Sequence, residues 1–171
     1  LISSLKRLIA KKCDLRQGVL RRLLTGQTRL PGFSAPWRVK RLGELAHLYQ
    51  PETIAQSAFT STGYPVYGAN GVIGYFSRFN HAEPQIMISC RGNCGSVNKT
   101  SGPAWINGNA MVVNIERNKH FVDFDFLYYL LSVTDFSPVV TGTGQPQIVR
   151  GPLAELPLSI PEQKEEQTEN T

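Results

Sequence analysis

The chain has 171 residues, of which 41% are hydrophobic and 18% charged, and a formal net charge of +5 at pH 7. This size allows one domain with a moderate core plus an appendage. No apolar run approaches the roughly 20 residues needed to span a bilayer, and the many Lys and Arg of the N-terminal segment exclude a secretory signal. We therefore expect a cytoplasmic protein that does not enter a membrane.

Charge is distributed unevenly along the chain. Residues 1–41 contain eleven Lys or Arg and one acidic residue, whereas residues 42–171 contain seven basic and twelve acidic residues. Residues 42–154 alone are close to neutral, with six basic and seven acidic side chains. Basicity therefore belongs to the N-terminal segment.

An amphipathic helix is predicted over residues 1–24, because apolar side chains recur there at three- and four-residue steps. The expected packing residues are Leu1, Leu5, Leu8, Leu15, Val19 and Leu23. Gly18 lowers helix propensity by about 1 kcal/mol relative to Ala, so the helix needs a partner surface. Its basic face either binds phosphates or is simply solvated, as most charged helix faces are. The basic residues concerned are Lys11, Lys12, Arg16, Arg21 and Arg22.

A linker and a globular domain are predicted to follow this helix. Residues 25–36 are too rich in Pro and Gly to continue a regular element. The globular domain is expected over residues 37–160, with Trp37, Val39 and Leu42 as anchors of its first strand or short helix.

Two hairpins and a further strand predict a β-rich core. Residues 64–75 form the first hairpin around Asn70-Gly71, a dipeptide that tolerates positive φ. Residues 85–97, read as QIMISCRGNCGSV, form two strands joined by a tight loop rich in hydrogen-bonding groups. A third strand pattern covers residues 105–115.

One helix and one loop are predicted in the last third of the domain. Asp123 is a good N-cap for a helix through about Ser132, in which Tyr128 and Tyr129 are expected to pack at the core or its rim. Residues 141–148 form a polar glycine-rich loop, and the extended pattern after Pro146 argues against a following helix and hence against a phosphate-binding turn.

The segment after the domain is predicted to leave it. Residues 156–161 read as an extended arm. Residues 161–171 read as the start of a truncated second spacer helix or as a disordered tail, with Pro161 and acidic residues where a helix N-terminus favours them.

Five blocks of the sequence, in their order, resemble a known family. YPVYGANGVIGY, ISCRGNCGSVN, NGNAMVV, DFLYYLL and TGTGQPQI resemble the target recognition domain of the specificity subunit of type I DNA restriction and modification systems. The opening segment resembles the end of that subunit's long spacer helix. The resemblance implies an α+β fold: a mixed, β-rich globular recognition domain with a short packing helix, preceded by a long amphipathic spacer helix.

The resemblance also implies a function without catalysis or cofactor. The expected function is sequence-specific binding of double-stranded DNA, reading one half of a bipartite site. The expected protein partners are methyltransferase (modification) subunits, the restriction (endonuclease/translocase) subunit, and a second copy or second half of the specificity subunit. The alternative is an assembly module that binds other subunits and has no DNA specificity of its own.

The candidate DNA-binding residues carry side chains that pair with base edges and phosphates. They are Tyr67, Asn70, Tyr75, Arg78, Arg91, Asn93, Asn98, Lys99, Gln145, Gln147 and Arg150. A structural role competes for each of them: Asn70 and Asn93 also suit the stabilisation of their own turns, and Gln145 suits backbone hydrogen bonding.

The sequence gives little support for a metal site or a catalytic site. His47, His81 and His120 lie far apart and form no metal-binding spacing, and Cys90 and Cys94 lack the second pair that zinc requires. The odd cysteine count predicts reduced thiols. No histidine lies near Cys90 as a base, so an enzyme using Cys90 is the least favoured hypothesis. The sequence also shows no pattern of a methyl-donor pocket or a nuclease carboxylate cluster.

Overall fold

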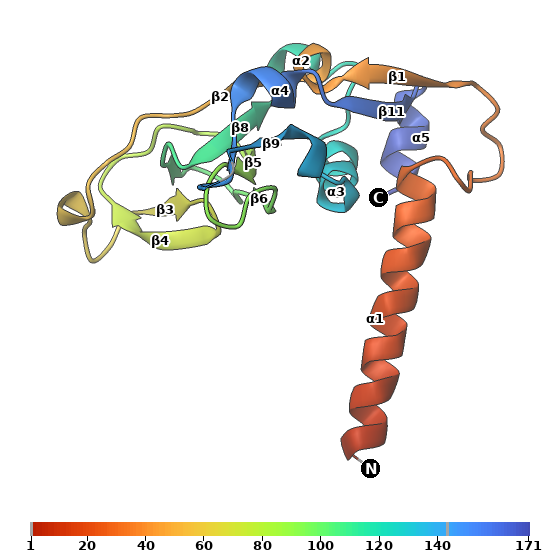
Figure 1. Cartoon of the computed structure of the whole chain (residues 1–171), viewed down its shortest axis with the longest axis horizontal. Coiled ribbons are helices and arrows are strands. Elements are labelled where there is room, and N and C mark those ends of the chain that lie inside the picture. Colours follow the sequence, from red (N-terminus) through yellow and green to blue (C-terminus); the bar gives the residue numbers. More distant parts are fainter. Residues whose placement is uncertain (1, 143) are drawn as a thin grey trace.

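A computed structural model describes residues 2–142 and 144–171, with the side chains of Cys13 and Arg16 left out. Leu1, one of the expected packing residues, therefore lies outside the described residues. Figure 1 shows a long helix, α1 (Ile2–Leu24), projecting from a domain of short helices and small sheets. The α+β fold with a preceding amphipathic helix is confirmed.

Most of α1 stands clear of the domain. Along its stripe Ile2, Leu5, Leu8, Leu15 and Val19 are between 51% and 74% exposed. Only the last turns enter the domain, where Leu24 is fully buried in the main core. Within the described residues, no helix combines the length and apolarity needed to cross a bilayer.

The first and last strands of the domain form a two-stranded antiparallel ribbon. β1 (Trp37–Arg41) pairs with β11 (Pro157–Pro161), from Trp37 opposite Pro161 to Arg41 opposite Pro157. The expectation that residues 156–161 leave the domain is wrong, because Leu158 and Ile160 are buried in its core. Val39 is also not an anchor: the ribbon lies at the surface and this side chain is 71% exposed.

A four-stranded antiparallel sheet forms the centre, in the order β2-β8-β5-β6. Its strands are β2 (His47–Tyr49), β5 (Ile86–Ser89), β6 (Val97–Lys99) and β8 (Ala110–Asn114). The predicted hairpin of β5 and β6 is confirmed. Ile86 and Ile88 belong to the main core while Met87, between them, belongs to a second cluster, because alternate strand residues point to opposite faces. Both faces of the sheet are therefore covered.

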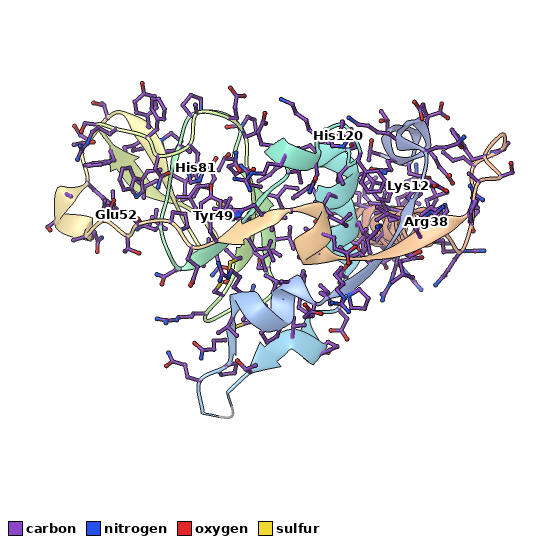
Figure 2. All side chains as sticks on the ribbon, turned by 90° about the horizontal axis from the view of Figure 1, so that it is seen from above. Lys12, Arg38, Tyr49, Glu52, His81 and His120 are labelled. Carbon is purple, nitrogen blue, oxygen red and sulfur yellow. The ribbon has the colours of Figure 1, made fainter. Side chains whose placement is uncertain are left out.

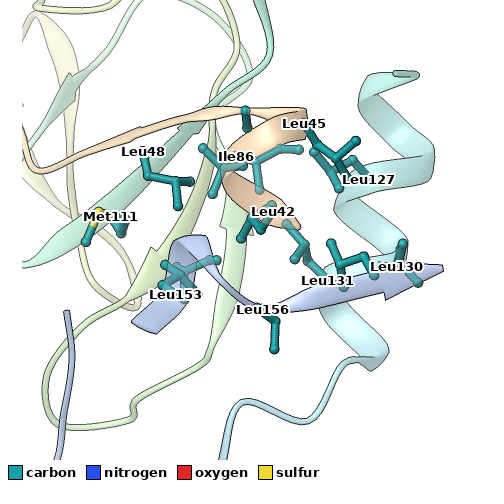
Figure 3. Packing of buried hydrophobic residues seen from close by; sticks show 14 of the residues in the cluster. Leu42, Leu45, Leu48, Ile86, Met111, Leu127, Leu130, Leu131, Leu153 and Leu156 are labelled. Carbon is teal, nitrogen blue, oxygen red and sulfur yellow. The ribbon is translucent and has the colours of Figure 1, made fainter. Parts of the chain in front are cut away.

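Helices cover one face of this sheet and form the main core. The leucines of α2 (Leu42–Leu45), α3 (Phe124–Val133) and α4 (Arg150–Ala154) converge on the sheet, as Figure 3 shows. α3 begins as predicted, with the Asp123 carboxylate accepting a hydrogen bond from the Phe126 backbone N–H at 2.9 Å. Short 3₁₀ turns at Glu116–Asn118 and Ser137–Val139 flank α3.

The helix after the glycine-rich loop was not expected. β9 (Val140–Thr141) and β10 (Gln147–Ile148) pair across the loop, and α4 starts directly afterwards. A proline costs little in the first turn of a helix, where its missing N–H would have no partner. Pro152 occupies that turn in α4, so the extended residues after Pro146 do not prevent a helix.

A three-stranded sheet packs on the other face of the central sheet, in the order β4-β3-β7. β3 (Tyr64–Gly68) and β4 (Gly71–Phe76) form the predicted hairpin, and β7 (Trp105–Ile106) runs parallel to β3. A 3₁₀ turn at Gln56–Ala58 precedes the hairpin. The four residues buried between the two sheets are Met87, Ile106, Ala110 and Val112.

A partly buried polar network lies beside this second cluster. The Tyr49 hydroxyl is 2.7 Å from His81 Nε2, and His81 Nδ1 is 2.6 Å from Asn80 Oδ1; Figure 2 labels Tyr49 and His81. Burial lowers the pKa of His81, so the imidazole is neutral near pH 7. The Asn80 oxygen must accept, so the neutral ring donates from Nδ1 and accepts the tyrosine hydroxyl at Nε2.

The last helix, α5 (Lys164–Glu169), is packed into the domain. Its Glu166 side chain is fully buried. The carboxylate accepts hydrogen bonds from Arg29 Nε at 2.9 Å, from Arg29 Nη2 at 2.7 Å and from the Trp37 indole at 3.0 Å. The adjacent Gln167 amide donates to the carbonyls of Phe121 and Pro161. Residues 161–171 are thus tied to both the linker and the central body.

Replacing Glu166 is expected to destabilise the fold. Glu166→Ala leaves the Arg29 guanidinium and the Trp37 indole without their acceptor, so the melting temperature should fall by several degrees. Glu165→Ala, at an exposed position one residue earlier, is the matched control and should melt like the parent chain. Equal melting temperatures of the two variants, measured by circular dichroism, would contradict the role given to Glu166.

Candidate nucleic-acid interface

Three segments far apart in the sequence meet on one side of the domain. We call residues 67–73, 90–98 and 140–150, apart from Thr143, the loop surface. The Asn98 side-chain amide donates to the Ala69 carbonyl at 3.3 Å, which joins β6 to the turn of the β3–β4 hairpin. Arg91 and Gln147 pair as an antiparallel bridge, and the Ile148 N–H donates to the Cys90 carbonyl at 2.9 Å. The three segments thus support one another through hydrogen bonds.

The two cysteines fix the loop between β5 and β6. Cys94 Sγ lies 3.3 Å from the Cys90 carbonyl and 3.2 Å from the Pro146 carbonyl, so this thiol links two segments of the loop surface. Gly95, with φ of +84°, leaves room for Phe136, whose side chain would lie 3.0 Å from an added Cβ. The cysteines therefore serve as small packing residues, as expected.

Cys90 is not suited to nucleophilic chemistry. It is almost completely buried, and burial raises the pKa of its thiol to about 11. A thiol with this pKa is protonated at neutral pH, whereas the thiolate is the reactive form. Among the described residues, His, Cys, Asp and Glu form no cluster that could hold a metal ion.

The loop surface carries no acidic residue. Its three segments contain Arg91 and Arg150 but neither Asp nor Glu, although the chain has 13 acidic residues. Eight of the candidate residues lie on it: Tyr67, Asn70, Arg91, Asn93, Asn98, Gln145, Gln147 and Arg150. Figure 2 shows the β9–β10 segment projecting from the body of the domain. Polar and cationic side chains are therefore concentrated on one rim.

The other three candidates lie elsewhere. Tyr75 and Arg78 are at the end of the hairpin opposite to its turn, where Tyr75 is paired with Pro65 and bridged by Thr60. The Arg78 guanidinium lies 5.6 Å from the centre of the Phe76 ring.

Lys99 points to the helical face of the central sheet. It follows Asn98 on β6, so its side chain points the other way. Its ammonium group is 2.6 Å from Asp125 Oδ1 and 4.7 Å from the centre of the Tyr128 ring, and the hydrogen bond to Asp125 raises the pKa of Lys99. The half-buried Tyr128 and Tyr129 pack at the rim, as expected.

The basic residues of α1 form a second cationic region, separate from the loop surface. Lys11, Lys12, Arg21 and Arg22 are exposed on this helix, and Figure 2 labels Lys12 there. The side chain of Arg16 lies outside the described part of the chain. Thr143, within the β9–β10 loop, lies outside it as well.

Sequence reasoning missed the contacts that hold these regions in place. Glu166 binds a residue 137 positions away in the chain, and His81 binds one 32 positions away. No local spacing links such pairs. The only signal was the type of residue: an Arg and a Trp in the first 40 residues can both donate hydrogen bonds to a carboxylate, and the last residues are rich in Glu.

Substitutions of Lys99 and Arg91 should separate folding from binding. Lys99→Ala should lower the free energy of unfolding by about 1 kcal/mol or less, since both charges of the pair are more than a third exposed, and should leave DNA binding unchanged. Arg91→Ala should weaken DNA binding and leave the melting temperature unchanged. Thermal melts measure stability, and fluorescence anisotropy with labelled duplexes measures DNA binding. A Lys99→Ala variant that melts like the parent chain but binds DNA more weakly would place Lys99 in the interface.

The fold is that of solved specificity subunits. The chain superposes on the S subunit of a type I restriction-modification system from M. genitalium with a TM-score of 0.72, at 21% identity over 82% of this chain and 38% of that one. It superposes on the HsdS subunit from Thermoanaerobacter tengcongensis with a TM-score of 0.62, at 20% identity over 99% of this chain and 44% of that one. These likenesses define the class of fold.

The chain belongs to the type I restriction modification DNA specificity domain family, whose model matches residues 35–171. It is 27% identical to a putative type I restriction enzyme specificity subunit of Haemophilus influenzae, over 77% of this chain and 34% of the relative. It is also 27% identical to the EcoprrI specificity subunit of Escherichia coli, over 57% of this chain and 24% of the relative. The chain thus spans about a third or less of these relatives.

Membership of this family defines a non-catalytic domain for DNA recognition. The expected family and fold are confirmed, and the hypothesis of an enzyme based on Cys90 is not retained.

Proposed function

We propose that this chain binds double-stranded DNA in a sequence-specific manner and reads one half of a bipartite site through the loop surface. The observation that carries the proposal is the complete lack of Asp and Glu in three segments that meet there. An acidic side chain would repel the phosphates beside a base edge, whereas Asn, Gln and Arg form direct hydrogen bonds to bases.

α1 and the loop surface have different roles in this proposal. α1 holds most of the excess positive charge and supplies affinity for any duplex that falls steeply with salt. The loop surface holds little net charge but many directional hydrogen-bonding groups, which supply discrimination between sequences. Affinity and specificity are therefore separable by substitution.

Selection from a randomised duplex pool tests this proposal. The parent chain should enrich a defined half-site. Neutralising Lys11, Lys12, Arg21 and Arg22 to Gln should weaken binding to all duplexes by similar factors. Gln145→Ala should instead change the preferred sequence, because one base contact contributes about 1–3 kcal/mol of discrimination. Binding constants by anisotropy at two salt concentrations measure both effects. An intact chain that enriches no sequence would favour the assembly module without DNA specificity.

We infer the protein partners from the family. The chain recruits methyltransferase (modification) subunits and the restriction (endonuclease/translocase) subunit to its site in the cytoplasm. Supporting this are the names of its relatives, which are specificity subunits of type I restriction enzymes.

We also infer that α1 packs against another helix, from a second copy or a second half of a specificity subunit. Its apolar stripe is exposed. The stripe continues into a groove of about 580 Å³, which Leu15, Val19, Leu23 and Tyr129 line together with the end of α5. Such an apolar stripe is stable in water only when another apolar surface covers it.

Charged substitutions in the stripe should abolish self-association. The purified parent chain should sediment as a dimer at micromolar concentration, and the double variant Leu8→Glu, Leu15→Glu should sediment as a folded monomer, because a charge buried between helices is costly. Val39→Glu, at an exposed apolar position on β1, is the control and should remain dimeric. A parent chain of monomer mass would contradict pairing between two copies.

A further inference from the structure

The turn of the β3–β4 hairpin is an uncharged, apolar element inside the loop surface. Residues 64–77 contain no charged side chain. Next to the turn, Val72 and Ile73 are each 52% exposed. Two adjacent apolar residues that both reach solvent are unusual in a strand, where neighbours point to opposite faces and one face is normally covered.

A β-bulge places these two side chains. Val66 pairs with Gly74 and Tyr67 with Val72, so Ile73 is the extra residue without a partner on β3. Ile73 instead lies over Gly68, where an added Cβ would be 3.0 Å from Ile73 Cγ2. Val72 lies opposite Tyr67. Tyr67 and Gly68 are consecutive on β3, so their Cβ directions point to opposite faces. Val72 shares the face of Tyr67 and Ile73 that of Gly68, so the hairpin presents apolar groups on both of its faces.

The neighbours of the turn indicate what these groups contact. Asn70 is exposed within the turn, and Asn98 holds the turn through the Ala69 carbonyl. Protein docking would cover one face of a thin ribbon, whereas insertion into a groove covers both. The DNA major groove is about 12 Å wide, admits a two-stranded β-ribbon and presents one apolar group, the C5-methyl of thymine. The minor groove attracts cationic side chains, and this turn has none.

Resting on the proposed DNA-binding function, we propose that Val72 and Ile73 enter the major groove and contact thymine C5-methyl groups. The hairpin turn then distinguishes A·T from G·C pairs by apolar contact, while Asn70 lies next to it as a hydrogen-bonding group. Affinity for the half-site then depends on the methyl group itself.

The experiment replaces thymine by deoxyuridine, which lacks only the methyl group. The probe is the half-site duplex enriched by the parent chain from the randomised pool, resynthesised with deoxyuridine at one thymine at a time. At one or two positions the parent chain should bind about fourfold more weakly, the factor expected for one methyl group of buried apolar surface. Competition anisotropy measures this change.

Substitutions of Val72 and Ile73 test whether these residues contact the thymine methyl group. Ile73→Ala and Val72→Ala should weaken binding to the thymine duplex, and at least one should bind the thymine and deoxyuridine duplexes equally. Both residues are half exposed, so the variants should melt like the parent chain. Val39→Ala, at an exposed apolar position of β1, is the matched control and should keep the full preference for thymine.

Other results would overturn the inference in distinguishable ways. If the parent chain selects a half-site but no deoxyuridine substitution weakens binding, the methyl contact is refuted while the proposed function stands. If Ile73→Ala reduces capture of the purified methyltransferase subunit and leaves DNA affinity unchanged, the turn is a protein-docking element. If the parent chain selects no sequence, the proposed function fails and the inference fails with it.

Discussion

The buried carboxylate of Glu166 is the contact on which the arrangement of the chain depends. A carboxylate without solvent access is costly unless opposite charge and hydrogen bonds compensate for its lost hydration. Arg29 from the linker and Trp37 from the first strand supply both. Three distant segments thus meet at one group, which fixes the point where α1 leaves the domain and joins α5 to the central body.

A body packed on both faces of its central sheet supports the loop surface. Its central sheet is covered by helices on one face and by the smaller sheet on the other, so both faces exclude water. The loops are held by bonds to one another, such as the bridge of Arg91 with Gln147 and the Asn98 contact to Ala69. A surface ordered before binding loses less conformational freedom when it meets a partner.

The net charge of the domain and the distribution of its charged residues differ. Summed over residues 42–154 the domain is nearly neutral, yet its acidic residues lie outside the three segments of the loop surface. Salt screens exposed charges that lie farther apart than the Debye length of about 8 Å. The charges close to a phosphate, and not the net charge of the domain, therefore set the potential that the phosphate meets. In the proposed DNA-binding function, the strongly basic α1 adds a less selective attraction to phosphates.

The sequence by itself determined the elements whose cause is local. Periodicity defined α1, the Asn70-Gly71 turn and the glycine loop at Arg91 marked two hairpins, and the Asp123 cap marked the start of α3. Each depends on residues within a few positions of one another. Resemblance to the family then indicated the fold and the role in DNA recognition.

Only the tertiary structure decided which loops share a surface, that Lys99 faces α3, and that residues 157–161 return to pair with β1. These outcomes depend on contacts between residues tens of positions apart, for which local spacing carries no signal.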